Sequence, residues 1–248
     1  KFRHDQDRDA PKEIKKRFIS VTLTCITSLL ITGFFLNETL SFLSVFSAIG
    51  VSLNLRMVIA GLIGLTLIVC LFLGPLVDSS WLKGYAWLEA LQQTTNAIVG
   101  LDPVEWRNII VAPLTEELVF RCCMCTLLEA GGFSKSFVIF CSPLFFGIAH
   151  LHHLVVRPPM MVIAQFGYTT VFGWIAAFLF VKTHHLAAPF MAHAFCNFWG
   201  FPDIASIPSI TTNKGKIVWI AYVMGVIFFF TMVYELVIVE DLYHQLSI

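Results

Sequence analysis

Long stretches without a charged side chain are the feature of this sequence that most limits how the chain can fold. Four of them are long enough to cross the hydrocarbon core of a bilayer as a helix, at residues 18–36, 57–77, 158–181 and 217–234. A helix at the surface of a soluble protein has a polar face, whereas these stretches are apolar all round. Charged residues make up 13% of the 248 residues, against about 25% in an ordinary soluble domain. The sequence therefore predicts a helical membrane protein.

We expect an all-α, polytopic transmembrane bundle with about seven to eight membrane-embedded helices, because a helix satisfies all its backbone polar groups within one lipid-embedded segment. Residues 39–51 are apolar but short, and they are expected to form an interfacial or re-entrant element. No second domain is visible, so residues 1–248 are interpreted as a single integral-membrane domain. Beyond the second span, helices are predicted at residues 107–129, 134–151, 160–182, 186–200 and 216–240.

Two polar segments are expected to lie outside the hydrocarbon core. Residues 1–17 form a polar lead-in, and the four basic side chains at 12–17 favour a cytosolic N-terminus by the positive-inside rule. Residues 78–106 combine charged side chains with three tryptophans, which is typical of an amphipathic segment at the membrane interface. The chain does not begin with Met, so we expect it to be part of a longer protein.

Composition also argues against two classes of function. The formal net charge is zero, so the chain has no electrostatic footprint for nucleic acid and no such partner is expected. The seven cysteines lie mostly inside apolar stretches, and no CxxC pair occurs with a matching His or Cys set. Neither a disulfide framework nor a structural zinc site is therefore predicted.

Three groups of polar residues interrupt the apolar part of the chain, where each ionisable side chain costs about 2.5–3.5 kcal/mol on insertion scales. The first group is Glu116, Glu117 and Arg121. On a helix, Glu117 and Arg121 are four residues apart and can form an ion pair, whereas Glu116 points about 100° away. One carboxylate is then neutralised, and the other can act as a general base. The alternative is a structural ion pair with Glu116 facing the lipid headgroups.

The other two groups contain histidines. His150 ends an apolar segment and is followed by His152 and His153, which are expected where the chain leaves the membrane. His193 and Asn197 lie one helical turn apart on one face, and both can donate hydrogen bonds to a developing oxyanion. Each group also has a structural interpretation, as a satisfied core histidine or as a polar contact between membrane helices.

Taken together, Glu116, His150, His193 and Asn197 come from three separate apolar helices. They offer a base, an imidazole that positions water, and two oxyanion donors, which are the groups needed to hydrolyse an amide. The sequence has no GxSxG elbow and no HExxH motif, and the cysteines near Glu116 have no neighbouring histidine in sequence to ionise them. A zinc protease with Glu116, His150 and His193 as ligands stays open at this point.

Three extended segments contain these residues: VAPLTEELVFRCC at 111–123, PLFFGIAHLHH at 143–153 and HAFCNFWGFP at 193–202. Together they resemble the type II CaaX prenyl endopeptidases, the Ras-converting enzymes of eukaryotes, within the superfamily of glutamate intramembrane proteases and bacteriocin-processing proteins. Weaker similarity at EIKKRF, LFLGPL and QFGYTTVFG extends the resemblance, in the same order, over nearly the whole chain. The family pattern also implies another span before EIKKRF and a longer loop between His153 and Gln165.

The resemblance implies a multi-pass protease of the endoplasmic reticulum membrane. Such enzymes remove the last three residues from proteins whose CaaX cysteine carries a farnesyl or geranylgeranyl group. The implied partners are prenylated CaaX proteins, such as small GTPases of the Ras type, and the lipid bilayer, with no cofactor and no metal. A zinc protease with the same residues and a non-catalytic lipid-binding scaffold of the same fold are the alternatives.

The resemblance also implies a role for each residue of the three motifs. The family's catalytic glutamate corresponds to Glu116, and its partner in activating the attacking water corresponds to His150. The residues assigned to the oxyanion hole correspond to His193 and Asn197. The remaining motif positions, which support the site, are Glu117 and Arg121.

Overall fold

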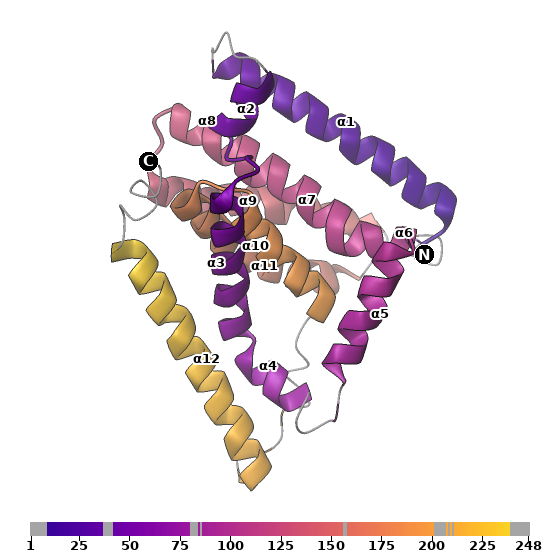
Figure 1. The fold of residues 1–248 in the computed structure, drawn as a ribbon, viewed down its shortest axis with the longest axis vertical. Coiled ribbons are helices and arrows are strands. Elements are labelled where there is room, and N and C mark those ends of the chain that lie inside the picture. Colours follow the sequence, from indigo (N-terminus) through magenta and orange to yellow (C-terminus); the bar gives the residue numbers. More distant parts are fainter. Residues whose placement is uncertain are drawn as a thin grey trace.

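The structure is a computed structural model that describes residues 9–36, 42–79, 84, 86–155, 158–200, 207, 209 and 211–238. All regular secondary structure in these residues is helical (Figure 1), which confirms the predicted all-α fold. The α-helices are α1 (Pro11–Phe35), α2 (Phe42–Ala48), α3 (Leu55–Leu71), α4 (Leu73–Val77), α5 (Trp87–Val99), α6 (Pro103–Glu105), α7 (Ala112–Glu117), α8 (Met124–Ala130), α9 (Lys135–Ala149), α10 (Pro159–Thr183), α11 (Ala187–Trp199) and α12 (Asn213–Ile238). The other helical segments are η3 (Trp106–Val111), η4 (Leu118–Cys123) and η5 (His150–Val155).

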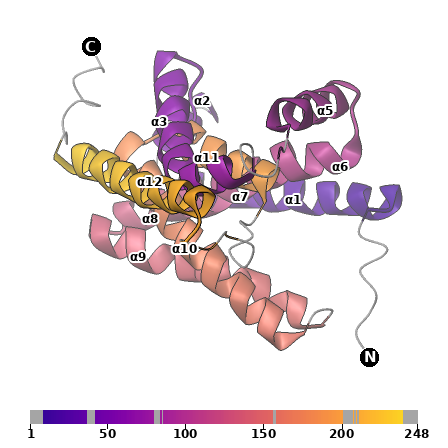
Figure 2. The same cartoon turned by 90° about the horizontal axis from the view of Figure 1, so that it is seen from below.

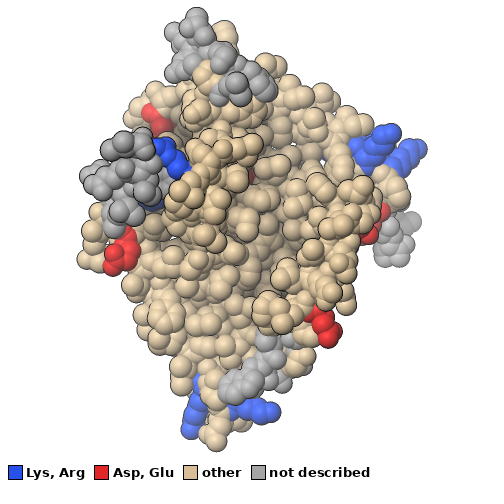
Figure 3. Space-filling model, viewed as in Figure 1, with Lys and Arg blue, Asp and Glu red and all other residues tan. Residues whose placement is uncertain are grey.

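The outer surface of the bundle is apolar. Among the described helices, α1, α10 and α12 are long and apolar enough to cross a membrane, and α3 and α9 are shorter apolar helices. Large side chains project outward from them, such as Phe34 at 79% exposure and Met160 at 77%. Figure 3 shows charged residues around the edge of one face and an uncharged centre. An exposed apolar surface of this extent is typical of a membrane protein, in agreement with the prediction.

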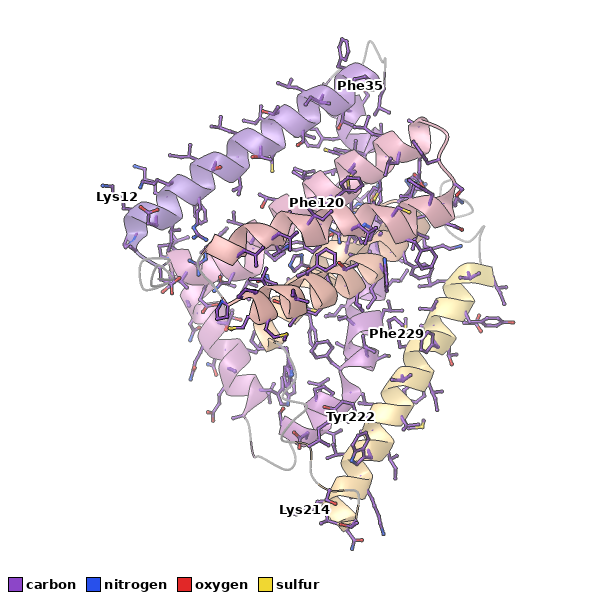
Figure 4. The ribbon with its side chains drawn as sticks, turned by 180° about the vertical axis from the view of Figure 1, so that it is seen from behind. Lys12, Phe35, Phe120, Lys214, Tyr222 and Phe229 are labelled. Atoms are coloured by element: carbon purple, nitrogen blue, oxygen red, sulfur yellow. The ribbon has the colours of Figure 1, made fainter. Side chains whose placement is uncertain are left out.

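The helices form three layers (Figure 2). Helices α1, α7 and α11 lie in the middle, α3 and α5 lie on one side of them, and α9 and α10 lie on the other. Helix α12 packs against α3 and α4, and Tyr222 and Phe229 lie on the side of α12 that faces them (Figure 4). Helix α11 packs against both α3 and α10, so its side chains lie between the outer layers.

Two glycines allow the layers to approach closely. A Cβ atom on Gly64 of α3 would overlap the backbone carbonyl of Ala188 in α11. A Cβ atom on Gly147 of α9 would overlap the hydroxyl group of Thr170 in α10. Lipid tails are as apolar as the helices, so membrane helices associate largely through van der Waals contact at such small residues. The positions of α9, α10 and α11 therefore depend on the absence of a side chain at these sites.

The turn between α10 and α11 is fixed by His185, which is 4% exposed. Its Nδ1 accepts a hydrogen bond from the amide of Ala187 at 3.0 Å, and its Nε2 donates to the carbonyl of Ser52 at 3.0 Å. Burial lowers the pKa of His185, because a low-dielectric environment disfavours the charged ring. The neutral ring thereby ties the first turn of α11 to the segment that precedes α3.

Two of the predicted helices are less regular than expected. The span predicted at 57–77 is interrupted at Phe72, between α3 and α4, because Pro75 lacks the N–H that would bond to the carbonyl of Leu71. The helix predicted at 107–129 is a continuous helical run, but π-helical segments η3 and η4 flank α7. The simple 3.6-residue geometry assumed for this run is therefore wrong in η3 and η4.

The two predicted interfacial segments are partly described. Residues 39–51 include α2, and residues 37–41 lie outside the described part of the chain. Within 78–106, α5 buries none of its residues, as expected for an amphipathic helix at a surface. The polar lead-in is described from residue 9, and α1 already begins at Pro11.

Replacing Gly64 by alanine is expected to destabilise the protein, because the added methyl group meets backbone atoms of α11 that cannot rotate away. Overpacking costs about 1–3 kcal/mol, and each kcal/mol lowers the melting temperature by roughly 2–4 °C in a chain of this size. The matched control is Gly167→Ala in α10, where nothing lies within 4 Å of the added Cβ. Thermal unfolding in detergent measures both variants, and equal melting temperatures would contradict this packing.

Candidate active site

A buried ion pair lies at the centre of the candidate site. Glu117 at the end of α7 and Arg121 in η4 have side chains that are 0% and 1% exposed, and Arg121 Nε lies 3.1 Å from Glu117 Oε2. The ion pair predicted from their spacing is therefore present. The guanidinium carbon of Arg121 also lies 4.5 Å from the ring centroid of Phe146 in α9, a cation–π contact. In the described part of the chain, Arg121 Nη1 and Nη2 have no hydrogen-bond acceptor, so this ring face compensates part of their charge.

Glu117 has a second partner, which the sequence did not predict. Its Oε1 lies 2.7 Å from Nδ1 of His193 in α11. A carboxylate can only accept a hydrogen bond, so Nδ1 carries the proton in this contact. The imidazole lies between aromatic rings, with centroid distances of 4.9 Å to Phe172 and 6.3 Å to Phe146. Glu117 therefore links α7 to α11 and fixes the orientation of the His193 ring.

Glu116 points away from this buried pair. Its side chain is 36% exposed, and its Oε2 lies 3.9 Å from Nε2 of His193. It interacts electrostatically with His193 and with His150. The predicted separation of the two carboxylates is therefore observed, since Glu117 is enclosed by its partners whereas Glu116 is accessible.

His150 lies at the junction between α9 and η5. Its Nδ1 is 2.8 Å from the backbone oxygen of Phe146, and a carbonyl only accepts, so Nδ1 carries the proton. The His150 and Phe146 rings pack edge to face with centroids 4.9 Å apart. In the neutral ring, Nε2 then carries the lone pair. His152 and His153 belong to η5, and their side chains lie outside the described part of the structure.

Asn197 lies one turn beyond His193 on α11, at the end of the helix nearest to η3. It is exposed, and its Nδ2 donates to the backbone oxygen of Asn108 in η3 at 2.9 Å. Phe146 thus contacts the rings of both His150 and His193, and Glu116 lies 3.9 Å from His193, one turn before Asn197 on α11.

Sequence reasoning missed Phe146 and Asn108. Phe146 contacts the rings of both histidines and the guanidinium of Arg121. Its position four residues before His150 in an apolar helix is a signal that could have found it. Asn108 contributes through its backbone carbonyl, and no side-chain pattern would have indicated that contact.

The sequence left open a zinc site formed by Glu116, His150 and His193, but these side chains are not arranged as a metal centre. Among the described residues, no three His, Cys, Asp or Glu side chains are arranged to hold a metal ion. The Nδ1 atoms of His150 and His193 are both directed to protein acceptors. Nε2 of His193 faces Glu116 at 3.9 Å, which is too long for a direct hydrogen bond.

An accessible carboxylate lies near two imidazoles inside an apolar helical bundle, an arrangement whose chemistry is compatible with a membrane-embedded hydrolase. A family model described as "Type II CAAX prenyl endopeptidase Rce1-like" matches residues 103–199. The chain is 36% identical over 242 residues to the "Probable CAAX prenyl protease 2" of Schizosaccharomyces pombe, covering 90% of this chain and 81% of that protein.

Two further relatives are both named "CAAX prenyl protease 2". The human protein is 35% identical over 232 residues, covering 83% of this chain and 67% of the relative. The Arabidopsis thaliana protein is 43% identical over 141 residues, covering 53% of this chain and 43% of that protein. No solved structure matches the chain. With this degree of similarity over most of its length, the chain belongs to the family of type II CaaX prenyl endopeptidases and is a protease.

Replacing Arg121 by methionine is expected to destabilise the protein strongly, because Glu117 would keep a buried charge without its cation. Removing one partner of a buried pair costs about 3–5 kcal/mol. The control is Lys16→Met, which breaks the pair of Lys16 with Glu13, whose side chains are 60% and 36% exposed. Such exposed pairs contribute little to stability, because solvent screens their attraction. Thermal unfolding compares the two variants, and an R121M protein as stable as K16M would show that the buried pair is dispensable.

Proposed function

We propose that the protein is a multi-pass intramembrane endopeptidase of the endoplasmic reticulum that removes the aaX tripeptide from farnesylated or geranylgeranylated CaaX proteins, such as Ras-type small GTPases. The observation that carries the proposal is the accessible carboxylate of Glu116 beside the imidazoles of His150 and His193. The names of the relatives support the reaction. The region matched by the family model includes every residue of the proposed site.

Glu116 and His150 activate the attacking water in this proposal. Because His150 Nδ1 donates to the carbonyl of Phe146, its Nε2 accepts a hydrogen bond from the water and orients it. Glu116 removes a proton as the water oxygen bonds to the scissile carbonyl carbon. When the C–N bond breaks, Glu116 returns that proton to the departing amine of the tripeptide. No metal or cofactor enters this scheme.

His193 and Asn197 stabilise the oxyanion that forms on the scissile carbonyl. Asn197 has a second Nδ2 hydrogen besides the one given to Asn108. His193 donates through Nε2, which requires the imidazolium form because its Nδ1 proton is already given to Glu117 across the 2.7 Å contact. Arg121 keeps Glu117 in place, so Glu117 and Arg121 support the site. Preorganised donors of this kind contribute about 10²–10³ in kcat each.

The two alternatives are less well supported. In a zinc protease, Glu116, His150 and His193 would act as ligands, but the described side chains form no such group. A lipid-binding scaffold would have no need of a carboxylate and two imidazoles at one point in an apolar bundle, since each buried polar group costs free energy unless it is used or satisfied.

We also propose the membrane arrangement. The chain forms one domain of seven to eight embedded helices. They include the long spans α1, α10 and α12, the helical run through α7, and the shorter helices α3, α9 and α11. Helices α1 and α12 run in the same general direction, with Lys12 and Lys214 in their first turns (Figure 4). These basic ends favour the cytosolic side, and α5 lies at the interface. Prenylated substrates then meet the site from the bilayer that already holds their lipid.

The mechanism predicts that Glu116→Ala and His150→Ala each lower kcat for cleavage of a farnesylated CaaX peptide by the purified protein, by about 10²–10⁴-fold. Wild-type activity is expected to survive a strong zinc chelator, because no step uses a metal. The assay measures release of the tripeptide in detergent or liposomes. Thermal unfolding of each variant separates loss of catalysis from loss of folding.

Two outcomes of that assay would contradict the proposal. Activity that is lost with the chelator and restored by zinc would make the same residues metal ligands. A well-folded wild-type protein without activity in either detergent or liposomes would favour the scaffold interpretation.

The substrate's lipid is expected to provide much of its binding energy. Burial of an alkyl chain contributes about 0.8 kcal/mol per CH₂, so four such groups correspond to roughly 10²-fold in kcat/KM. An unprenylated CaaX peptide of the same sequence should therefore be cleaved at least about 10²-fold less efficiently. Equal kcat/KM for the two peptides would show that the enzyme does not recognise the prenyl group.

A further inference from the structure

A backbone carbonyl next to the site lacks its usual helical partners. The oxygen of Asn108 lies in the π-helical segment η3. In an α-helix it would accept from the amide of residue 112, and in a π-helix from that of residue 113. The amide of Ala112 instead donates to the carbonyl of Arg107. Residue 113 is a proline and has no N–H. Neither position can therefore satisfy the carbonyl of Asn108.

The side chain of Asn197 provides the missing donor. Its Nδ2 lies 2.9 Å from the oxygen of Asn108, although the two residues belong to different helices. Because an amide group has two Nδ2 hydrogens in a plane, binding one of them to a fixed acceptor also fixes the direction of the other. The carbonyl at position 108 thus determines how the Asn197 amide is turned.

The segment that carries this acceptor is itself held in place. Arg107 is buried, and its Nε donates to Oδ1 of Asn108 at 3.1 Å. Its Nη1 forms an ion pair with Asp9, at 2.7 Å. Pro113 is buried in the first turn of α7, three residues before Glu116. The acceptor for Asn197 and the helix of Glu116 are therefore parts of one continuous run.

We propose that Pro113 is a positioning residue for the oxyanion hole: by leaving the carbonyl of Asn108 without a helical donor, it holds the Asn197 amide so that its second N–H points to the reacting carbonyl. This inference rests on the proposed function for the direction in which Asn197 donates. It assigns to Pro113 an effect on catalysis that passes through another residue. Pro113 itself touches neither water nor substrate in this scheme.

Replacing Pro113 by alanine restores an N–H that competes with Asn197 for the carbonyl of Asn108. We expect kcat to fall, by up to about 10²-fold for a displacement near 1 Å, with KM for the farnesylated peptide unchanged. In an Asn197→Ala background, Pro113→Ala should cause no further loss, because the amide that it positions is already absent. All four proteins are compared with enzyme in excess, so that slow variants remain measurable.

The matched control is Pro189→Ala, which adds an N–H to the first turn of α11, where it competes with no side chain of the site. It should keep the wild-type kcat. A P113A protein with wild-type kcat, or losses from P113A and N197A that multiply in full, would overturn the proposal. If Pro113 had a purely structural role, P113A would lower the melting temperature, and its effect on kcat would add to that of N197A.

A second measurement does not depend on the folding of P113A. In wild-type protein labelled with ¹⁵N-asparagine, the Asn197 side-chain amide should show the NMR shift and slow exchange of a hydrogen-bonded proton, and Asn197→Ala identifies its signal. A freely exchanging amide would overturn the proposal. If the wild type does not cleave the prenylated peptide, the proposed function fails. If it does, and P113A matches it, only the positioning role fails.

Discussion

The shared carboxylate of Glu117 is the interaction on which the rest of the site depends. One oxygen faces Arg121 and the other faces His193, so a single buried group joins α7, η4 and α11. A carboxylate and a guanidinium in an apolar bundle are tolerated only together, because either one alone would be an uncompensated charge. Because the two charges neutralise each other, a second carboxylate, that of Glu116, can lie next to them while its side chain stays accessible.

The irregular backbone around α7 also provides a polar contact between helices. A regular α-helix would give each carbonyl of the run an intrahelical donor and would leave nothing to hold a side chain from another helix. The π-helical turn at η3 and the proline at 113 remove such donors at one point. Membrane proteins tolerate this only where another polar group replaces the lost bond, and Asn197 does so. π-Turns of this kind are frequent at functional sites.

The sequence predicted those features that depend on residues close together in the chain. The ion pair of Glu117 with Arg121 follows from four-residue spacing, and the apolar stretches predict the helices. The contact of His193 with Glu117 joins residues 76 positions apart, and no local rule could indicate it. The break at Phe72 has a visible cause in Pro75, which the hydrophobic pattern alone concealed. The π-helical segments were missed because periodicity rules assume 3.6 residues per turn.

The polar contacts of the candidate site therefore depend on close packing of the helices in this bundle. Gly147 lets α9 approach α10, and the neighbouring Phe146 contacts Arg121 of η4 and His193 of α11. A wider separation of α9 from η4 and α11 would remove the aromatic face of Phe146 from the guanidinium and from the ring of His193. The small residues that hold helices together in lipid thus also affect the distances between the groups of the candidate site. Since no hydrophobic force between helices can restore a lost contact, the geometry of the site is only as exact as this packing.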